Sequence, residues 1–220
     1  LFVMLLSLLV FTIQGCTTKE AAPQSNTEQI KELQKKYQYK DNKKLSKNLY
    51  SLGIYYKNMG EYPKALVYAE KTMTINEKVL GKEHLHTATS YSSLGDIYSD
   101  MGEYPKALKY YLKALSLQEK VLGGEHAHVA ESYDDLSVLY KRKGEYLKAL
   151  EYADKALVIR EKILGEAHTD TAESYNSLAM LYKKMGDYPK ALVYAEKTMI
   201  IDEKVLGKEH LYTAMSYSNL

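Results

Sequence analysis

The stretch EYPKALVYAEKTMTINEKVLGKEH (Glu61–His84) returns almost unchanged as DYPKALVYAEKTMIIDEKVLGKEH (Asp187–His210). Two less similar copies lie between them, so a unit of about 42 residues recurs along the chain. A fixed period of this length is typical of a stacked array, in which each unit buries its apolar face only against its neighbours. The close match three units apart indicates that a three-unit block was duplicated.

Glycine marks both turns of every unit. One turn contains Gly60, Gly102, Gly144 or Gly186, and the other contains Gly81, Gly123, Gly165 or Gly207, each followed three residues later by a histidine. Glycine tolerates the left-handed backbone that commonly ends a helix. We therefore predict two helices per unit, with a glycine after each.

The unit Ala88–Val129 shows the two helices clearly. The apolar positions of its first helix recur at helical spacing and lie on one face of that helix: Ala88, Tyr91, Leu94, Gly95 and Tyr98. This helix is expected to stop at Met101-Gly102. The second has Pro105 in its first turn, where a missing N–H costs nothing, and ends at Gly123. The predicted lengths are about 14 and about 18 residues, or roughly 21 and 27 Å.

Two further expectations concern polar residues near the helix ends. Asp170 or Thr171 is expected to cap the first helix of the fourth unit, and Glu173 could complete a capping box with Asp170. The Glu-Lys pairs late in the second helices are expected on the solvated face: Glu119-Lys120, Glu161-Lys162 and Glu203-Lys204.

Composition gives no support for a nucleic-acid partner. The 220 residues carry a net charge of +2, with 26% charged residues and a mean hydropathy of -0.40. Tyrosine is almost the only aromatic, with 22 Tyr against 2 Phe and no Trp. Tyr suits positions where the ring is buried and the hydroxyl reaches water or a hydrogen-bond partner.

The start of the chain is a different kind of segment. Leu1–Ile13 is almost entirely apolar but shorter than the roughly 20 residues needed to span a bilayer, and it fits the apolar region of a secretory signal. Ile13-Gln14-Gly15-Cys16 resembles the lipobox of bacterial lipoproteins. That resemblance implies that residues 1–15 are a signal peptide and that Cys16 is lipidated. It also implies a membrane-anchored protein of the bacterial cell envelope, facing the periplasm or the exterior.

Alternatives to lipidation stay open at this point. The leader could remain as an uncleaved anchor, or be removed in ordinary secretion. Cys16 is the only cysteine, so an intramolecular disulfide is excluded. Residues 16–44 are expected to hold the lipidated cysteine and a flexible tether, of which residues 17–27 are polar, with room for a short leading helix.

Residues 45–220 resemble a tetratricopeptide repeat (TPR) protein of the kinesin-light-chain type. The positions that carry this resemblance are a leucine (Leu52, Leu94, Leu136, Leu178, Leu220), a small residue after it (Gly53, Gly95, Ser137, Ala179), a tyrosine (Tyr56, Tyr98, Tyr140, Tyr182) and an alanine (Ala65, Ala107, Ala149, Ala191). The family's usual tryptophan is replaced by Tyr91, Tyr133 and Tyr175. The resemblance implies an all-α fold, a right-handed α-solenoid of stacked antiparallel helix pairs with about four and a half repeats. We expect the array to continue past Leu220.

In TPR arrays the first helices line a concave groove, and the resemblance places its residues by unit. They are Lys47, Tyr50, Ile54, Lys57 and Asn58; Thr89, Ser92, Asp96, Ser99 and Asp100; Glu131, Asp134, Val138, Lys141 and Arg142; and Glu173, Asn176, Met180, Lys183 and Lys184. Lys141, Arg142, Lys183 and Lys184 would form a basic patch for an acidic peptide or a C-terminal carboxylate. The alternative is that these cations only complement helix C-termini.

No pattern of catalytic or metal-binding residues emerges. His84, His126, His168 and His210 fall one per unit, roughly 10 Å apart, too far to share an ion, and we predict a structural role in the turns. No Gly-rich phosphate loop or Cys/His cluster occurs in the sequence. We therefore expect no enzyme activity, metal, cofactor or small-molecule substrate.

The sequence favours a scaffold or adaptor that binds a protein or peptide in the groove while tethered to a membrane. One alternative is a regulatory or sensing arm of a larger enzyme, such as a protease or kinase, whose catalytic domain lies beyond residue 220. Another is an adaptor held at a membrane by an uncleaved leader.

Overall fold

The computed structural model describes residues 31–32, 35 and 41–219. The chain divides into two units, Leu1–Lys40 and Asp41–Leu220, and the repeats occupy the second. In the first unit the described residues Lys31, Glu32 and Lys35 are helical. The predicted signal peptide and Cys16 lie outside the described residues. Every regular element of the described ranges is an α-helix.

The helices of the second unit alternate as first and second helices of successive repeats. The first helices are α3 (Asn42–Asn58), α5 (Leu85–Asp100), α7 (Ala127–Arg142), α9 (Thr169–Met185) and α11 (Leu211–Asn219). The second helices are α4 (Tyr62–Val79), α6 (Tyr104–Leu122), α8 (Tyr146–Leu164) and α10 (Tyr188–Leu206). Thus α3 and α4 form repeat 1, α9 and α10 form repeat 4, and α11 begins a fifth.

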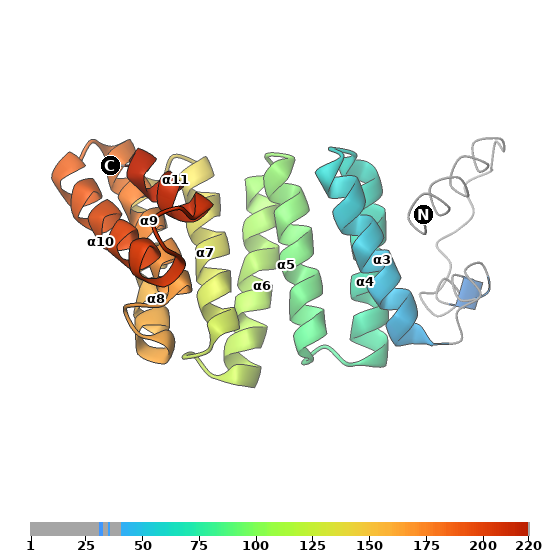
Figure 1. Ribbon diagram of the computed structural model, residues 1–220. Helices are drawn as coiled ribbons and strands as arrows, with labels where there is room; N and C mark the ends of the chain where they lie inside the picture. The colour runs from blue at the N-terminus through green and yellow to red at the C-terminus, as the bar shows by residue number, and fades with distance from the viewer. Residues whose placement is uncertain (1–30, 33–34, 36–40, 220) are drawn as a thin grey trace. The chain divides into compact units, whose positions relative to one another are not determined.

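Packing follows chain order. Each first helix packs most extensively on the second helix of its own repeat, and each second helix then packs on the first helix of the next. Figure 1 shows the pairs following one another in a row from α3 to α11. The predicted all-α architecture of stacked helix pairs is confirmed.

Histidine sets where the first helices begin. The Nδ1 atoms of His84, His126 and His168 accept hydrogen bonds from the backbone N–H two residues later, at 3.1, 3.2 and 3.1 Å. The helix α5 therefore starts at Leu85, three residues earlier than expected, and is 16 residues long. The structural role predicted for these histidines is confirmed.

The cap predicted for the fourth unit is wrong. His168, not Asp170 or Thr171, is the N-cap of α9. Asp170 lies inside the helix, and its backbone N–H donates to His168. The Thr171 hydroxyl instead donates to the Gly165 carbonyl at 2.8 Å, which holds the preceding turn against the helix. The His168 side chain therefore caps the helix, although the shorter side chain of Asp170 or Thr171 was expected to do so.

The predicted turn chemistry is confirmed. The turn glycines have φ between 73° and 99°, as at Gly102 (76°) and Gly186 (81°), a region that L side chains rarely adopt. Pro63, Pro105 and Pro189 occupy the first turn of their helices. Each helix pair therefore begins and ends at backbone positions that its sequence specifies.

Stacked tyrosines fill the space between the two helices of every repeat. The pairs are Tyr56–Tyr68, Tyr98–Tyr110, Tyr140–Tyr152 and Tyr182–Tyr194, with ring centroids 5.4 to 5.7 Å apart and nearly parallel planes. The tyrosine of each second helix thus stacks on the tyrosine of the first helix of the same repeat.

Repeat 2 packs differently at one point. Its second helix carries Tyr111, where the other repeats have Ala69, Ala153 and Ala195. A Cβ added to Gly95 would lie 2.6 Å from the Tyr111 ring, whereas one added to Gly53 would meet nothing closer than 3.6 Å. The small residue predicted to let helices approach is thus essential at Gly95, because a buried ring lies over it.

Candidate functional site

A polar side chain from each second helix bonds a serine of the next first helix. The serine is constant, while its partner changes in length and charge. The pairs are Asn76 with Ser90 (2.8 Å), Gln118 with Ser132, Arg160 with Ser174 (2.5 Å) and Asp202 with Ser216. We call residues 76, 118, 160 and 202 the linker row, since they connect successive repeats.

Two pockets of similar size open beside the linker row. The first-repeat pocket, between α3, α4 and α5, has a volume of about 580 Å³, and the fourth-repeat pocket, between α9, α10 and α11, has about 540 Å³. Each is lined by the linker-row residue, Asn76 or Asp202, and by a threonine one turn earlier, Thr72 or Thr198. The two pockets therefore occupy equivalent places three repeats apart.

The linings of the two pockets differ in charge. The first-repeat pocket contains Lys43 and Lys47 together with His84 and His86, and no carboxylate. The fourth-repeat pocket contains Glu173, Asp202 and His210, and neither lysine nor arginine. The two pockets have the same helical framework, but the charged side chains that they offer to a ligand have opposite signs.

Predicted groove residues of neighbouring first helices meet one another. Lys57 of α3 lies 3.5 Å from Asp96 of α5. The Arg142 guanidinium of α7 lies 2.7 Å from Asp100, also of α5, and donates to Ser99 at 3.3 Å. The hydrogen bond to Asp100 raises the pKa of Arg142. These contacts show that successive first helices present the predicted positions to a common face.

An acidic group lies between repeats 2 and 3. Burial, followed by the neighbouring carboxylates of Asp96, Asp134 and Glu131, raises the pKa of Asp135 to about 8 against the opposing effect of Lys57. The Tyr111 hydroxyl donates to Asp96 at 2.8 Å. Sequence reasoning missed Asp135, although the equivalent residues of repeats 1, 2 and 4 are serine: Ser51, Ser93 and Ser177.

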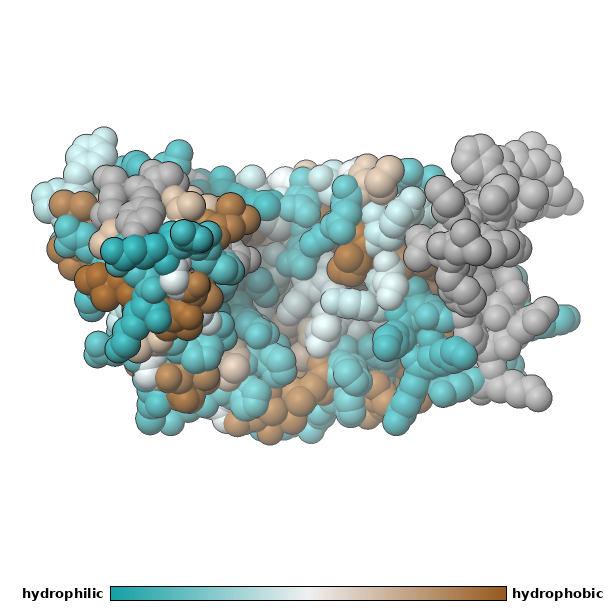
Figure 2. Space-filling model, in the orientation of Figure 1, coloured by the Kyte–Doolittle hydropathy of each residue, from teal (hydrophilic) through white to brown (hydrophobic). Residues whose placement is uncertain are grey.

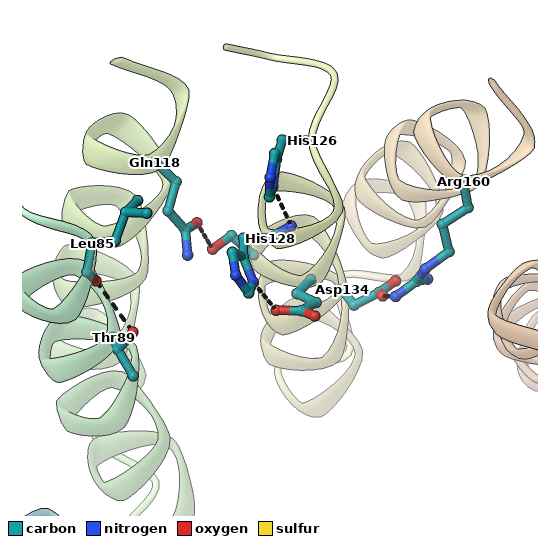
Figure 3. Close-up of polar contacts among 9 residues, drawn as sticks. Leu85, Thr89, Gln118, His126, His128, Asp134 and Arg160 are labelled. Carbon is teal, nitrogen blue, oxygen red and sulfur yellow. Dashed lines mark hydrogen bonds and ion pairs between the residues drawn. The ribbon is translucent and has the colours of Figure 1, made fainter. Parts of the chain in front are cut away.

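Arg160 joins three helices in repeats 3 and 4. From α8 it contacts Asp134 of α7 at 2.5 Å and Ser174 of α9 at 2.5 Å. Figure 3 shows the guanidinium reaching across to the Asp134 carboxylate. Burial raises the pKa of Asp134, and the Arg160 cation partly offsets this. The Asp134 carboxylate, which was predicted to face a ligand, is thus paired with Arg160 inside the array.

The remaining predicted groove residues are mostly accessible. Val138 and Met180 are 41% and 43% exposed. Ile54 and Lys141 are half-buried, and Asn58, Lys183 and Lys184 are exposed. Lys141, Arg142, Lys183 and Lys184 lie in the last turns of α7 and α9. Arg142 is engaged by Asp100, so the predicted basic patch retains only its three lysines for a ligand.

The Glu-Lys pairs late in the second helices do more than face solvent. Glu119 and Glu161 accept hydrogen bonds from the hydroxyls of Tyr133 (2.9 Å) and Tyr175 (2.6 Å) of the next repeat. Lys120 and Lys162 pair with Glu83 and Glu125 of the preceding turns. The predicted solvent exposure of these pairs is confirmed at Glu119, Lys120, Lys162 and Lys204, and the first two pairs also connect neighbouring repeats.

One face of the array is largely hydrophilic (Figure 2). Apolar residues lie on the side of α10, where Leu192, Val193, Ile200 and Val205 are exposed, and along the lower edge of this view. None of the helices in the described ranges is long and apolar enough to cross a membrane. Within the same ranges, no group of three or more His, Cys, Asp or Glu is placed to hold a metal ion.

Comparison with protein families settles the class of the array. The tetratricopeptide repeat model matches residues 45–120, 92–162, 139–199 and 170–220, which together cover most of the chain. The chain belongs to the tetratricopeptide repeat family. TPR domains bind protein or peptide partners and are generally non-catalytic scaffolds. No curated protein sequence matches the chain.

Solved TPR structures resemble the array closely. BtubC (BKLC) from P. vanneervenii is 26% identical with a TM-score of 0.67, over 76% of this chain and 66% of that one. A kinesin light chain-like protein of nearly identical TPR-like repeats from Podosopora anserina is 25% identical with a TM-score of 0.70, over 82% and 85%. A signal transduction ATPase with a TPR sensor from Pyrococcus horikoshii shares the fold, at 24% identity and a TM-score of 0.63, over 88% and 30%.

Proposed function

We propose that this TPR array is an interaction scaffold that binds a peptide or protein along the face formed by its first helices. The observation that carries the proposal is the pair of equivalent pockets, because predicted groove residues line both: Lys47, Tyr50 and Thr89 in one, and Glu173 and Asn176 in the other. Open pockets with polar side chains around a partly apolar floor suit side chains of a bound segment.

Site-specific photo-cross-linking tests this face. A photoreactive phenylalanine analogue in place of Val138 or Met180 would sit on the proposed binding face, whereas one replacing Val158 of the second helix α8, 62% exposed, would not. We expect a cross-linked partner from positions 138 and 180 and little from 158. Equal yields from the three positions would contradict binding on this face.

We also propose that the scaffold is tethered to a membrane of the bacterial cell envelope through Cys16. The apolar leader and the Ile13-Gln14-Gly15-Cys16 sequence support this proposal. Acyl chains anchor by burying CH₂ groups at about 0.8 kcal/mol each, so several chains on one cysteine would hold firmly.

Fractionation tests the anchor. Cys16→Ser should move the protein from the membrane pellet to the supernatant, while Thr17→Ser, which keeps the cysteine, should leave it in the pellet. If both variants fractionate with the membrane, lipidation of Cys16 is not the anchor.

A further inference from the structure

The two equivalent pockets differ in charge, and this difference specifies the kind of segment they fit. Building on the function proposed above, we infer that the array binds one extended segment of a partner protein, with acidic side chains at the first-repeat pocket and basic side chains at the fourth-repeat pocket. Lys43 and Lys47 line the first, and Glu173 and Asp202 line the second. Opposite charges at two ends fix the direction in which a segment can bind.

Pairing within the array leaves the end charges available to a ligand. In the middle of the proposed face, Lys57 is paired with Asp96, Arg142 with Asp100, and Arg160 with Asp134. Lys43, Lys47 and Glu173 have no ion-pair partner among the residues that the structure describes. Three charge pairs of the central stretch are thus satisfied within the array, while the flanking pockets keep charges of opposite sign.

Spacing indicates the length of the segment. Each repeat contributes two helices, and neighbouring helices pack 8 to 10 Å apart, so three repeats separate the pockets by at least roughly 24 Å. An extended chain advances roughly 3.3 Å per residue. The acidic and basic groups of the segment should therefore be at least about seven residues apart. A small molecule could occupy one pocket but could not contact both.

Peptide display on the full chain, purified in a mild detergent, tests the inference. A library of random 16-residue peptides is selected against the wild-type chain, against Lys43→Glu/Lys47→Glu and against Glu173→Lys. These residues are exposed, so the variants should fold, and circular dichroism checks their helix content. The matched controls are Lys109→Glu/Lys113→Glu on α6 and Glu196→Lys on α10, which line neither pocket.

We expect wild-type selections to enrich peptides with an acidic and a basic group at least about seven residues apart. Those peptides should bind the Lys43→Glu/Lys47→Glu variant at least tenfold more weakly, and a peptide whose acidic group is replaced by lysines should recover binding to it. Glu173→Lys should weaken binding through the basic group, and both controls should bind as the wild type does.

Other outcomes separate the two proposals. Enriched peptides that lack this charge pattern, or that bind the pocket variants as well as the wild type, would contradict the inferred bipolar segment. The proposed scaffold function would not be affected by that result. Binding that needs only one pocket would also contradict the bipolar segment. If no peptide is enriched over bare beads, the scaffold function fails as well.

Discussion

The flanking repeats 1 and 4 and the central repeats 2 and 3 use one framework for different purposes. In the flanks, the linker row has Asn76 and Asp202, and a pocket opens beside each. In the centre it has Gln118 and Arg160, and the guanidinium of Arg160 reaches Asp134 and Ser174. Positions 134 and 174 are equivalent to Tyr50 and Ser90, which line the first-repeat pocket. A few substitutions can therefore turn a ligand-facing position into an internal link.

The largest expected effect is at the point where repeat 2 packs most tightly. Gly95→Ala should lower the free energy of unfolding by about 3 kcal/mol, because its Cβ would overlap the buried Tyr111 ring. The matched flank variant is Gly53→Ala, which has room for a Cβ and should be neutral or stabilising by up to about 1 kcal/mol. Urea unfolding followed by circular dichroism measures both.

A second substitution tests whether the ring causes this difference. Adding Tyr111→Ala to Gly95→Ala gives repeat 2 nearly the same two residues as repeat 1, which has Gly53 and Ala69. The only difference is one extra methyl group at position 95. We expect the double variant to lose less stability than the sum of the losses in Gly95→Ala and Tyr111→Ala, because the overlap between the two side chains is relieved. Strict additivity of the two single losses would show that the contact between residues 95 and 111 is not responsible.

An intermediate effect is expected from replacing the central link by the flank residue. Arg160→Asn should cost about 2 kcal/mol, because it leaves the largely buried Asp134 carboxylate without its cation. Adding Asp134→Asn should recover much of this loss by removing the stranded charge. If Arg160→Asn is as stable as the wild type, the three-helix link does not stabilise the centre.

The smallest effect concerns pH and Asp135. Its pKa is raised to about 8, above the roughly 4 of an unfolded chain, so the folded state holds a proton that the unfolded state releases. The free energy of unfolding should therefore fall as pH rises from about 4 to about 8. Asp135→Ser, which introduces the residue of repeats 1, 2 and 4, should remove this slope and be more stable than the wild type at pH 8.

A matched variant isolates the buried carboxyl. Ser177→Asp places an aspartate at the equivalent position of repeat 4 and should introduce a slope of the same sign. Parallel urea midpoints for the wild type and Asp135→Ser between pH 5 and pH 8 would contradict an unusual titration at residue 135.

Local rules predict the framework because its determinants lie within one unit. The glycines at the turns, the prolines in the first turns and the period of the apolar positions all concern residues close in sequence. The His caps were placed in the right turn, but their capping role was missed because His is an unusual N-cap.

The chemistry of the face was harder to predict because it depends on pairs from different repeats. Arg142 resembled a ligand-binding cation until its contact with Asp100, 42 residues earlier, appeared. Asp135 and the linker row could have been found by comparing equivalent positions across units, where serine gives way to aspartate and asparagine to arginine. The pockets themselves depend on how far each side chain reaches, which spacing does not reveal.

The near-identity of Glu61–His84 and Asp187–His210 has a genetic consequence. Recombination between the two copies would remove or insert 126 residues, the distance from Glu61 to Asp187, and would join the chain at matching points of the helix pair. The hybrid junction would keep the same Tyr stack, since Tyr68 and Tyr194 have equivalent partners. Such an exchange would change the length of the array by three repeats while keeping the sequence of a complete helix pair at the junction.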